Sequence, residues 1–235
     1  MSVRLFVDSP LKLKQEVILT ENAHHYLVHV MRSVVGETVL LFNGKDGEWA
    51  GEIEKISKKE VQLRLVKNMR LQSEEKKSDV WLCFAPVKKD KMDFIIQKAT
   101  ELGVDVLQPV ITRRTVVGHI NANKMQLQAI EAAEQCERLS VPEIRQPVSL
   151  DLLLDKWEKG RTLYYLNERG EGKDFEKKKK VAYLVGPEGG FEPQEIEKIG
   201  LLKDACSVHL GRRILRAETA CISVLAIHNH LCGWK

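Results

Sequence analysis

Two glycine-bearing segments near the end of the chain carry the residues best suited to binding a ligand. Residues 186–191 read GPEGGF and follow an apolar run, and residues 211–216 read GRRILR and follow a predicted strand at 207–210. Glycine and proline together make a stiff turn whose backbone a ligand can approach without side chains in the way. Ligands of open parallel sheets bind beyond the carboxyl ends of the strands. We therefore predict that both segments open on the same edge of a sheet.

The spacing of the glycines limits the kind of ligand. Neither GxGxxG nor GxxxxGK[ST], the two common fingerprints of nucleotide phosphate binding, is present. A glycine-lined cleft without a phosphate-binding lysine suits a cofactor that carries no phosphate, such as S-adenosylmethionine. The alternative is that GPEGG is only a tight turn, because Gly and Pro are common in loops. The second segment favours a ligand site.

The elements that must position these loops fall into two domains. Residues 1–72 are rich in short strands, at 5–7, 17–19, 39–42, 49–56 and 61–66, with one helix at 22–32. This pattern predicts a small barrel, followed by a polar linker at 70–79. Residues 73–235 alternate strands (80–85, 106–111, 163–166, 181–185, 207–210) with helices (90–102, 123–139, from 149, 193–201, 217–231). Such alternation predicts an α/β domain with a mostly parallel sheet.

Composition and charge exclude several classes of protein. With 43% hydrophobic residues in 235, the chain has enough apolar side chains for a core, which excludes wholesale disorder. Its apolar runs fall far short of the roughly 20 residues that span a bilayer. The N-terminus resembles no export signal, and five scattered cysteines form no Cys-x-x-Cys pair, so we expect a cytoplasmic protein with reduced thiols. A net charge of +4 is too mild to prove a nucleic-acid partner.

The chain resembles the RsmE family, ribosomal RNA small subunit methyltransferases that act on N3 of a uridine. Both glycine loops look like the paired cofactor loops of that family, and further segments match in the family's order. In chain order these segments are 29–32 (HVMR), 42–44 (FNG), 96–104 (IQKATELGV), 132–138 (AAEQCER), 141–144 (VPEI), 185–191 (VGPEGGF) and 210–220 (LGRRILRAETA). One departure is Arg212, where members often have proline.

The resemblance implies a fold, a reaction and partners. The fold would be a SPOUT-type parallel sheet whose C-terminal chain forms a trefoil knot, preceded by a PUA-like or OB-like β-barrel that binds RNA. The reaction would be methylation of N3 of a uridine in 16S ribosomal RNA by S-adenosyl-L-methionine. The partners would be the small ribosomal subunit and a second copy of the chain, with no membrane. Pattern alone supports only an open parallel sheet, because threaded connections are nearly absent from proteins.

The same resemblance assigns residues to the cofactor. The expected cofactor-binding residues are Leu166, Leu184, Gly186, Pro187, Glu188, Gly189, Gly190, Leu210, Gly211, Ile214, Leu215 and Thr219. Arg216 and Glu218 are the catalytic candidates. Arg216 would stabilise the developing uracil anion or hold its phosphate, and the alternative is a surface arginine at a helix end. Glu218 would act in catalysis or simply meet the dipole of its helix. No residue is assigned as the general base.

Expected RNA contacts and rival interpretations complete the set of predictions. Basic residues that match family motifs or lie in clusters are expected to contact RNA: Arg32, Lys98, Arg113, Arg114, Arg138 and Arg213. Solvated surface or weak surface ion pairs are their alternatives.

No metal is expected, because His25 and His29 share a helix without a further ligand. Two other functions stay open: a non-catalytic RNA-binding factor, and a methyltransferase acting on a ribose hydroxyl or a guanine nitrogen.

Overall fold

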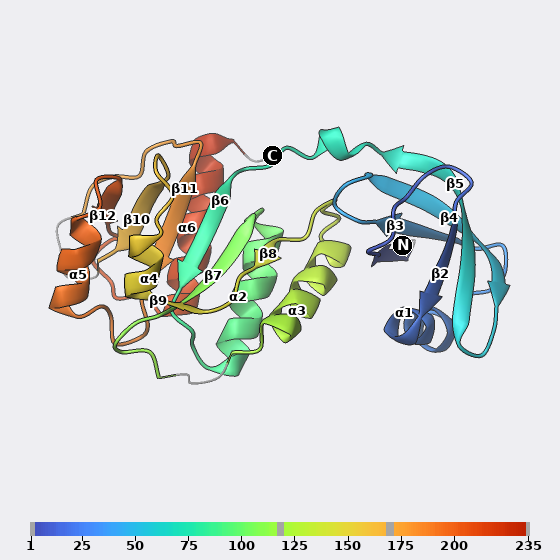
Figure 1. Cartoon of the computed structure of the whole chain (residues 1–235), viewed down its shortest axis with the longest axis horizontal. Helices are drawn as coiled ribbons and strands as arrows, with labels where there is room; N and C mark the ends of the chain where they lie inside the picture. Colours follow the sequence, from blue (N-terminus) through green and yellow to red (C-terminus); the bar gives the residue numbers. More distant parts are fainter. Residues whose placement is uncertain (1–2, 117–119, 168–171, 234–235) are drawn as a thin grey trace. The chain divides into compact units, whose positions relative to one another are not determined.

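The computed structural model describes residues 3–116, 120–167 and 172–233, and the chain divides into two compact units (Figure 1). One unit contains Met1–Lys76 together with Ala133–Val141, and the other contains Lys77–Ala132 and Pro142–Lys235. Within the described residues, no helix has the length and apolar character needed to cross a membrane.

The first unit is built on a five-stranded sheet in the order β1-β3-β4-β5-β2. Its strands are β1 (Arg4–Phe6), β2 (Glu16–Thr20), β3 (Thr38–Phe42), β4 (Glu48–Ile56) and β5 (Glu60–Arg70). Only β1 and β3 pair in parallel. Alternate residues of the strands point inward, as Val17 and Leu19 of β2 do, and form one apolar core. The predicted helix at 22–32 is α1 (Glu21–His25), which continues as one π-helical segment, Tyr26–Val30.

The segment Ala133–Val141 packs on this sheet through the buried Arg4. The guanidinium of Arg4 donates to Glu48 (2.5 Å) and to the carbonyl oxygens of Ala133 (2.8 Å) and Arg138. These contacts involve the last turn of helix α3 (Ala122–Gln135) and the residues after it, and the helix ends four residues before the predicted boundary at 139. The helix cannot continue because Glu137 has φ of +62° and the amide of Leu139 bonds a carboxylate instead of a helix carbonyl.

The second unit contains a parallel sheet in the order β12-β10-β11-β6-β7-β8, with β9 also on β7. Its strands are β6 (Val80–Phe84), β7 (Val106–Ile111), β8 (Glu143–Ile144), β9 (Val148–Ser149), β10 (Thr162–Leu166), β11 (Val181–Val185) and β12 (Ala205–Val208). The central strand β11 is buried along its whole length, as expected for a strand covered on both faces. The predicted α/β class with a parallel sheet is confirmed.

Helices cover both faces of this sheet. Leu150 and Leu153 of α4 (Leu150–Asp155) and Ile199 of α5 (Pro193–Gly200) share one apolar cluster with alternate residues of the central strands. On the opposite face lie α2 (Lys89–Glu101) and α6 (Ala217–Cys232), where the hydroxyl of Tyr183 on β11 hydrogen-bonds Nδ1 of His228 at 3.0 Å.

Strand β12 begins and ends earlier than predicted. It pairs with β10 from Leu163 opposite Ala205 to Leu166 opposite Val208, and β10 ends there. Pairing therefore stops at Val208, and His209 and Leu210, which the sequence placed in the strand, belong to the loop that follows.

Candidate functional site

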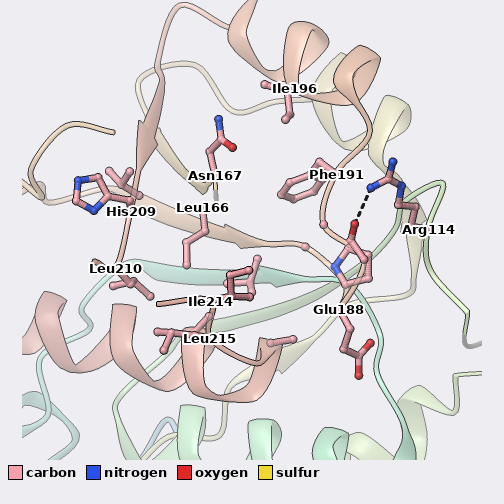
Figure 2. A pocket seen from close by; sticks show the side chains of 18 of the residues that line it. Arg114, Leu166, Asn167, Glu188, Phe191, Ile196, His209, Leu210, Ile214 and Leu215 are labelled. Atoms are coloured by element: carbon pink, nitrogen blue, oxygen red, sulfur yellow. Dashed lines mark hydrogen bonds between the residues drawn. The ribbon is translucent and has the colours of Figure 1, made fainter. Parts of the chain in front are cut away.

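A cavity of about 410 Å³ lies where β10, β11 and β12 end (Figure 2). The segments that line it are those that leave the three strands, together with the start of α5, the start of α6 and one residue from the loop after β7. The lining residues are Arg114, Leu166, Asn167, Val185, Gly186, Pro187, Glu188, Gly189, Gly190, Phe191, Pro193, Ile196, Val208, His209, Leu210, Gly211, Arg213, Ile214, Leu215, Ala217 and Ala220. Both glycine loops therefore meet at one site, on the sheet edge where the sequence analysis placed them.

Close packing explains why the first loop needs glycine. A Cβ atom on Gly186 would lie 3.1 Å from the ring of Phe191, and a Cβ on Gly189 would lie 3.3 Å from Cδ of Arg114. A hydrogen bond closes the turn, because the amide of Gly190 donates to the carbonyl oxygen of Pro187 at 2.8 Å. Gly190 itself has a positive φ of 68°, which favours glycine. The loop backbone is thereby held against the cavity.

Arg114, from the loop after β7, fixes the first glycine loop from outside. Its Nη1 donates to the carbonyl oxygen of Gly189 at 2.7 Å, the hydrogen bond drawn in Figure 2. Its neighbour Arg113 donates its amide to the buried carboxylate of Glu195, which also accepts the amide of Glu192 (both 2.9 Å). Both arginines were predicted as RNA contacts. Their contacts attach the loop after β7 to the first glycine loop and to α5.

The second loop is turned by Gly211 and exposes an apolar side chain. Gly211 has φ of +91°, and its amide donates to Nδ1 of His209 at 3.1 Å. The side chain of Ile214, although it lines the cavity, is 72% exposed. Leu215 follows it and leads into α6, whose N-cap is Arg216.

Charged side chains from three segments meet beside the cavity. Nζ of Lys91, in the first turn of α2, lies 3.1 Å from Oε1 of Glu188 and 3.7 Å from Oε2 of Glu218. Burial opposes ionisation of Glu188, but the hydrogen bond and charge of Lys91 outweigh it and hold the pKa of Glu188 below its ordinary value. In Figure 2 the side chain of Glu188 points away from Phe191 and Asn167, so its backbone is what lines the cavity.

Most of the predicted cofactor-binding residues lie in the cavity lining, ten of the twelve. The two outside it are Leu184 and Thr219. Leu184 is fully buried in the cluster under α4 and α5, because alternate residues of β11 face opposite sides of the sheet. Thr219 is exposed on α6.

The catalytic candidates occupy the start of α6. Arg216 is exposed and is not among the described residues that line the cavity, so its catalytic role stays a prediction. As N-cap of α6 it has an extended backbone, with φ of −66° and ψ of 154°. Glu218 is half-buried beside Lys91.

The other predicted RNA contacts are spread over both units. Arg32 is exposed after the helical segment of the first unit, and Arg213 is exposed at the cavity. Lys98 pairs with Glu101 at 2.8 Å on α2, and Arg138 donates to the hydroxyl of Ser140 at 3.1 Å.

The sequence analysis missed several residues of the cavity. Asn167 and His209 follow β10 and β12 directly, and the ring of Phe191 and the side chain of Ile196 complete the apolar wall (Figure 2). Phe191 ends the GPEGGF segment, and its position next to two glycines was a signal for a packed ring. Asn167 was detectable only by its place after a strand.

Comparison with protein-family models identifies the class of a chain that joins this parallel sheet, with its paired glycine loops, to a small β-unit. Residues 74–229 match the family model of the RNA methyltransferase domain, and residues 19–66 match that of the RNA methyltransferase PUA domain. The chain is thus an RNA methyltransferase-type protein with a PUA domain, which confirms the predicted PUA-like unit.

Similarity to known proteins narrows this class to one family. Ribosomal RNA small subunit methyltransferase E of Rickettsia conorii is 33% identical over 95% of this chain and 93% of its own length, and that of Bacillus subtilis is 31% identical over 88% and 87%. The crystal structure of ribosomal RNA small subunit methyltransferase E from Neisseria gonorrhoeae, bound to S-adenosyl methionine, has a TM-score of 0.88 at 28% identity and covers 99% of this chain and 98% of that one. The chain belongs to the ribosomal RNA small subunit methyltransferase E family.

Proposed function

We propose that this protein transfers a methyl group from S-adenosyl-L-methionine to N3 of a uridine in 16S ribosomal RNA. The observation that carries the proposal is the cavity where the two glycine loops meet, in a chain whose Neisseria gonorrhoeae relative was crystallised with S-adenosyl methionine. The specific acceptor atom follows from the resemblance of the loop motifs to those of uridine N3 methyltransferases.

The residues of the cavity fit this cofactor. Its volume, about 410 Å³, lies within the range of about 300–1,000 Å³ typical of small-molecule sites. The glycine backbone at 186–190 and 211 offers amides and carbonyls, and Leu166, Phe191 and Leu215 offer apolar surface for an adenine. A side chain at Gly186 or Gly189 would crowd this wall. When bound, S-adenosylmethionine supplies a methyl group already activated by its sulfonium.

The protein's own contribution is alignment and charge stabilisation. N3 of uracil must lose a proton, and a fixed cation beside the ring favours the resulting anion. We propose that Arg216 supplies this charge. Because it is exposed at the start of α6 rather than in the cavity lining, it would meet the RNA base and not the cofactor.

The proposed setting is the cytoplasm, with the chain as a homodimer acting on the small ribosomal subunit. RNA would contact the PUA domain near the exposed Arg32 and the second glycine loop at Arg213. Phosphate contacts of this kind position the RNA, and the base is read at the active site. We also propose that the C-terminal chain, residues 181–233, forms the trefoil knot of the SPOUT fold.

Nucleoside analysis tests the function. In 16S ribosomal RNA from a strain that lacks the gene, mass spectrometry is expected to show loss of 3-methyluridine, and purified protein with S-adenosylmethionine is expected to restore it. Loss of a ribose-methylated or guanine-methylated nucleoside instead would assign another acceptor. An unchanged nucleoside profile would favour a non-catalytic RNA-binding protein.

A further inference from the structure

Lys91 joins two carboxylates that belong to the two cofactor loops. Its ammonium group lies 3.1 Å from Glu188, in the first glycine loop, and 3.7 Å from Glu218, in the first turn of α6 after the second loop. In the sequence, Glu188 lies 97 residues after Lys91, and Glu218 lies 30 residues after Glu188. One lysine therefore connects α2, the first loop and the start of α6.

The burial of Lys91 and Glu218 distinguishes their contact from an ordinary surface ion pair, whereas the side chain of Glu188 is 46% exposed. The side chains of Lys91 and Glu218 are only 26% and 16% exposed. Oε2 of Glu218 is shielded from solvent and accepts no hydrogen bond from any residue the structure describes, so the ammonium at 3.7 Å is its nearest compensation. A carboxylate in that environment is costly without a neighbouring positive charge.

Lys91 lies at a position in its helix that is electrostatically unfavourable for a cation. A cation in the first turn of a helix is repelled by the positive end of the helix dipole, and Lys91 is the third residue of α2. A carboxylate in the same position is favoured, as Glu218 is in α6. In the part of the chain that the structure describes, the ion pairs of Lys91 are those with Glu188 and Glu218, and they offset this repulsion.

The charged groups of Lys91, Glu188 and Glu218 lie beside the cavity, and Glu188 is the one of the three that is among its lining residues. Glu188 lines the cavity through its backbone, and Glu218 adjoins the lining residue Ala217. Lys91 is outside the lining and acts through the two carboxylates. Two carboxylates and one ammonium carry one net negative charge as a group, and the side chains of Arg114 and Arg213 in the cavity lining and of Lys88, whose charge also acts on Glu188, add positive charge nearby.

We propose that Lys91 is a positioning residue that clamps the two cofactor loops together and limits the preference of the site for the charged methyl donor over its product. This inference rests on the proposed function. S-adenosylmethionine carries a sulfonium cation, whereas S-adenosylhomocysteine, the product, has a neutral thioether. Each negative charge beside the site favours the donor over the product, and the ammonium of Lys91 offsets one of the two carboxylate charges of Glu188 and Glu218.

The test is calorimetric binding of donor and product to the full-length chain at low salt. Lys91→Met keeps most of the side-chain stem and removes the charge. Because the loops are then held less tightly, we expect the dissociation constant of the product to rise about tenfold. For the donor, the added negative charge offsets most of that loss. We therefore expect the ratio of the dissociation constant of the product to that of the donor to rise about fivefold. This is the effect of one unit charge at several ångströms in a medium between protein and water. Lys91→Arg keeps the charge and is expected to keep the ratio within about twofold of wild type.

A matched control comes from another lysine ion pair. Lys198 on α5 contacts Asp151 at 2.6 Å on the exposed surface, away from the cavity lining. Lys198→Met is expected to leave both dissociation constants and their ratio unchanged. Circular dichroism verifies that each variant is folded. If Lys91→Met does not fold, Lys91→Arg is the variant that tests the inference. A product-to-donor ratio of dissociation constants more than about twofold from that of wild type would then count against it.

The outcomes separate this inference from the proposed function. Wild-type protein that binds neither ligand refutes the function and the inference together. Wild-type protein that binds both ligands, with an unchanged ratio in Lys91→Met, overturns the inference alone. An equal loss of affinity for donor and product would show that Lys91 is merely structural, and would also overturn it.

Discussion

Replacing Gly186 by alanine should damage the cofactor site through a single side chain. The added Cβ would meet three atoms of the Phe191 ring at 3.1, 3.2 and 3.3 Å, closer than the 3.4 to 4 Å of ordinary contact. Gly186 has no positive φ, so the backbone itself tolerates alanine. The whole effect must therefore come from displacement of the ring, which is 8% exposed and forms one wall of the cavity.

The size of the effect follows from that contact. Overpacking a filled site costs about 1–3 kcal/mol, and the overlap here is a few tenths of an ångström against an aromatic edge, so we expect about 1 kcal/mol of lost stability. A ring forced toward the cavity also takes space from the ligand. We therefore expect S-adenosylmethionine to bind about tenfold more weakly, which corresponds to about 1.4 kcal/mol.

Urea unfolding and titration calorimetry measure the two quantities. The matched control is Gly200→Ala at the end of α5, where an added Cβ meets nothing within 4 Å. Alanine is the better helix former, so this variant is expected to gain up to about 1 kcal/mol and to bind the donor normally. In a double-mutant cycle, Phe191→Leu with Gly186→Ala should show favourable coupling of at least about 0.5 kcal/mol. Normal donor affinity in Gly186→Ala, or additive effects in the cycle, would refute the reasoning.

Three further predictions concern other contacts. Arg114→Gln removes the charge-assisted hydrogen bond to the carbonyl of Gly189 and is expected to weaken donor binding about fivefold with little change in the melting temperature; equal affinity by calorimetry would contradict this. Hydrogen bonds from Asn43 and the amide of Leu11 hold the pKa of Asp46 below its ordinary value of 3.8. The stability from Asp46 is therefore present above that value and lost as the pH falls through the lower folded value, so Asp46→Ala should cost about 1 kcal/mol at neutral pH and progressively less in urea titrations from about pH 5 down to pH 2. Burial raises the pKa of the Cys83 thiol to about 12, so iodoacetamide at pH 8 should label it only after unfolding, and rapid labelling of the native protein, seen by mass spectrometry, would show that the strand is open.

The elements nearest the site were predictable because local pattern and tertiary role agree there. The run at 181–185 is wholly apolar and is followed by Gly186 and Pro187, so both the buried strand and its end were visible in the sequence. The two loops follow strands that the alternating pattern makes parallel, which placed them on one edge. The two loops were placed on this basis, and the resemblance to the RsmE family then named ten residues that line the cavity.

Features that depend on long-range pairing were not predictable. The end of β12 is set by its register with β10, which the composition of 205–210 does not reveal. The attachment of Ala133–Val141 to the first unit depends on Arg4, more than 120 residues away. The contacts of Arg113 and Arg114, whose side chains are exposed, were not predictable because their partners on α5 and the first glycine loop are 82 and 75 residues distant in sequence.

A crystal structure of this chain grown with S-adenosylmethionine tests the central claim most directly. The account predicts density for the cofactor in the cavity between Gly189 and Gly211, with the carbonyl of Gly189 still bonded to Arg114. Density for the cofactor at any other place on the molecule, with that cavity filled by solvent, would contradict it.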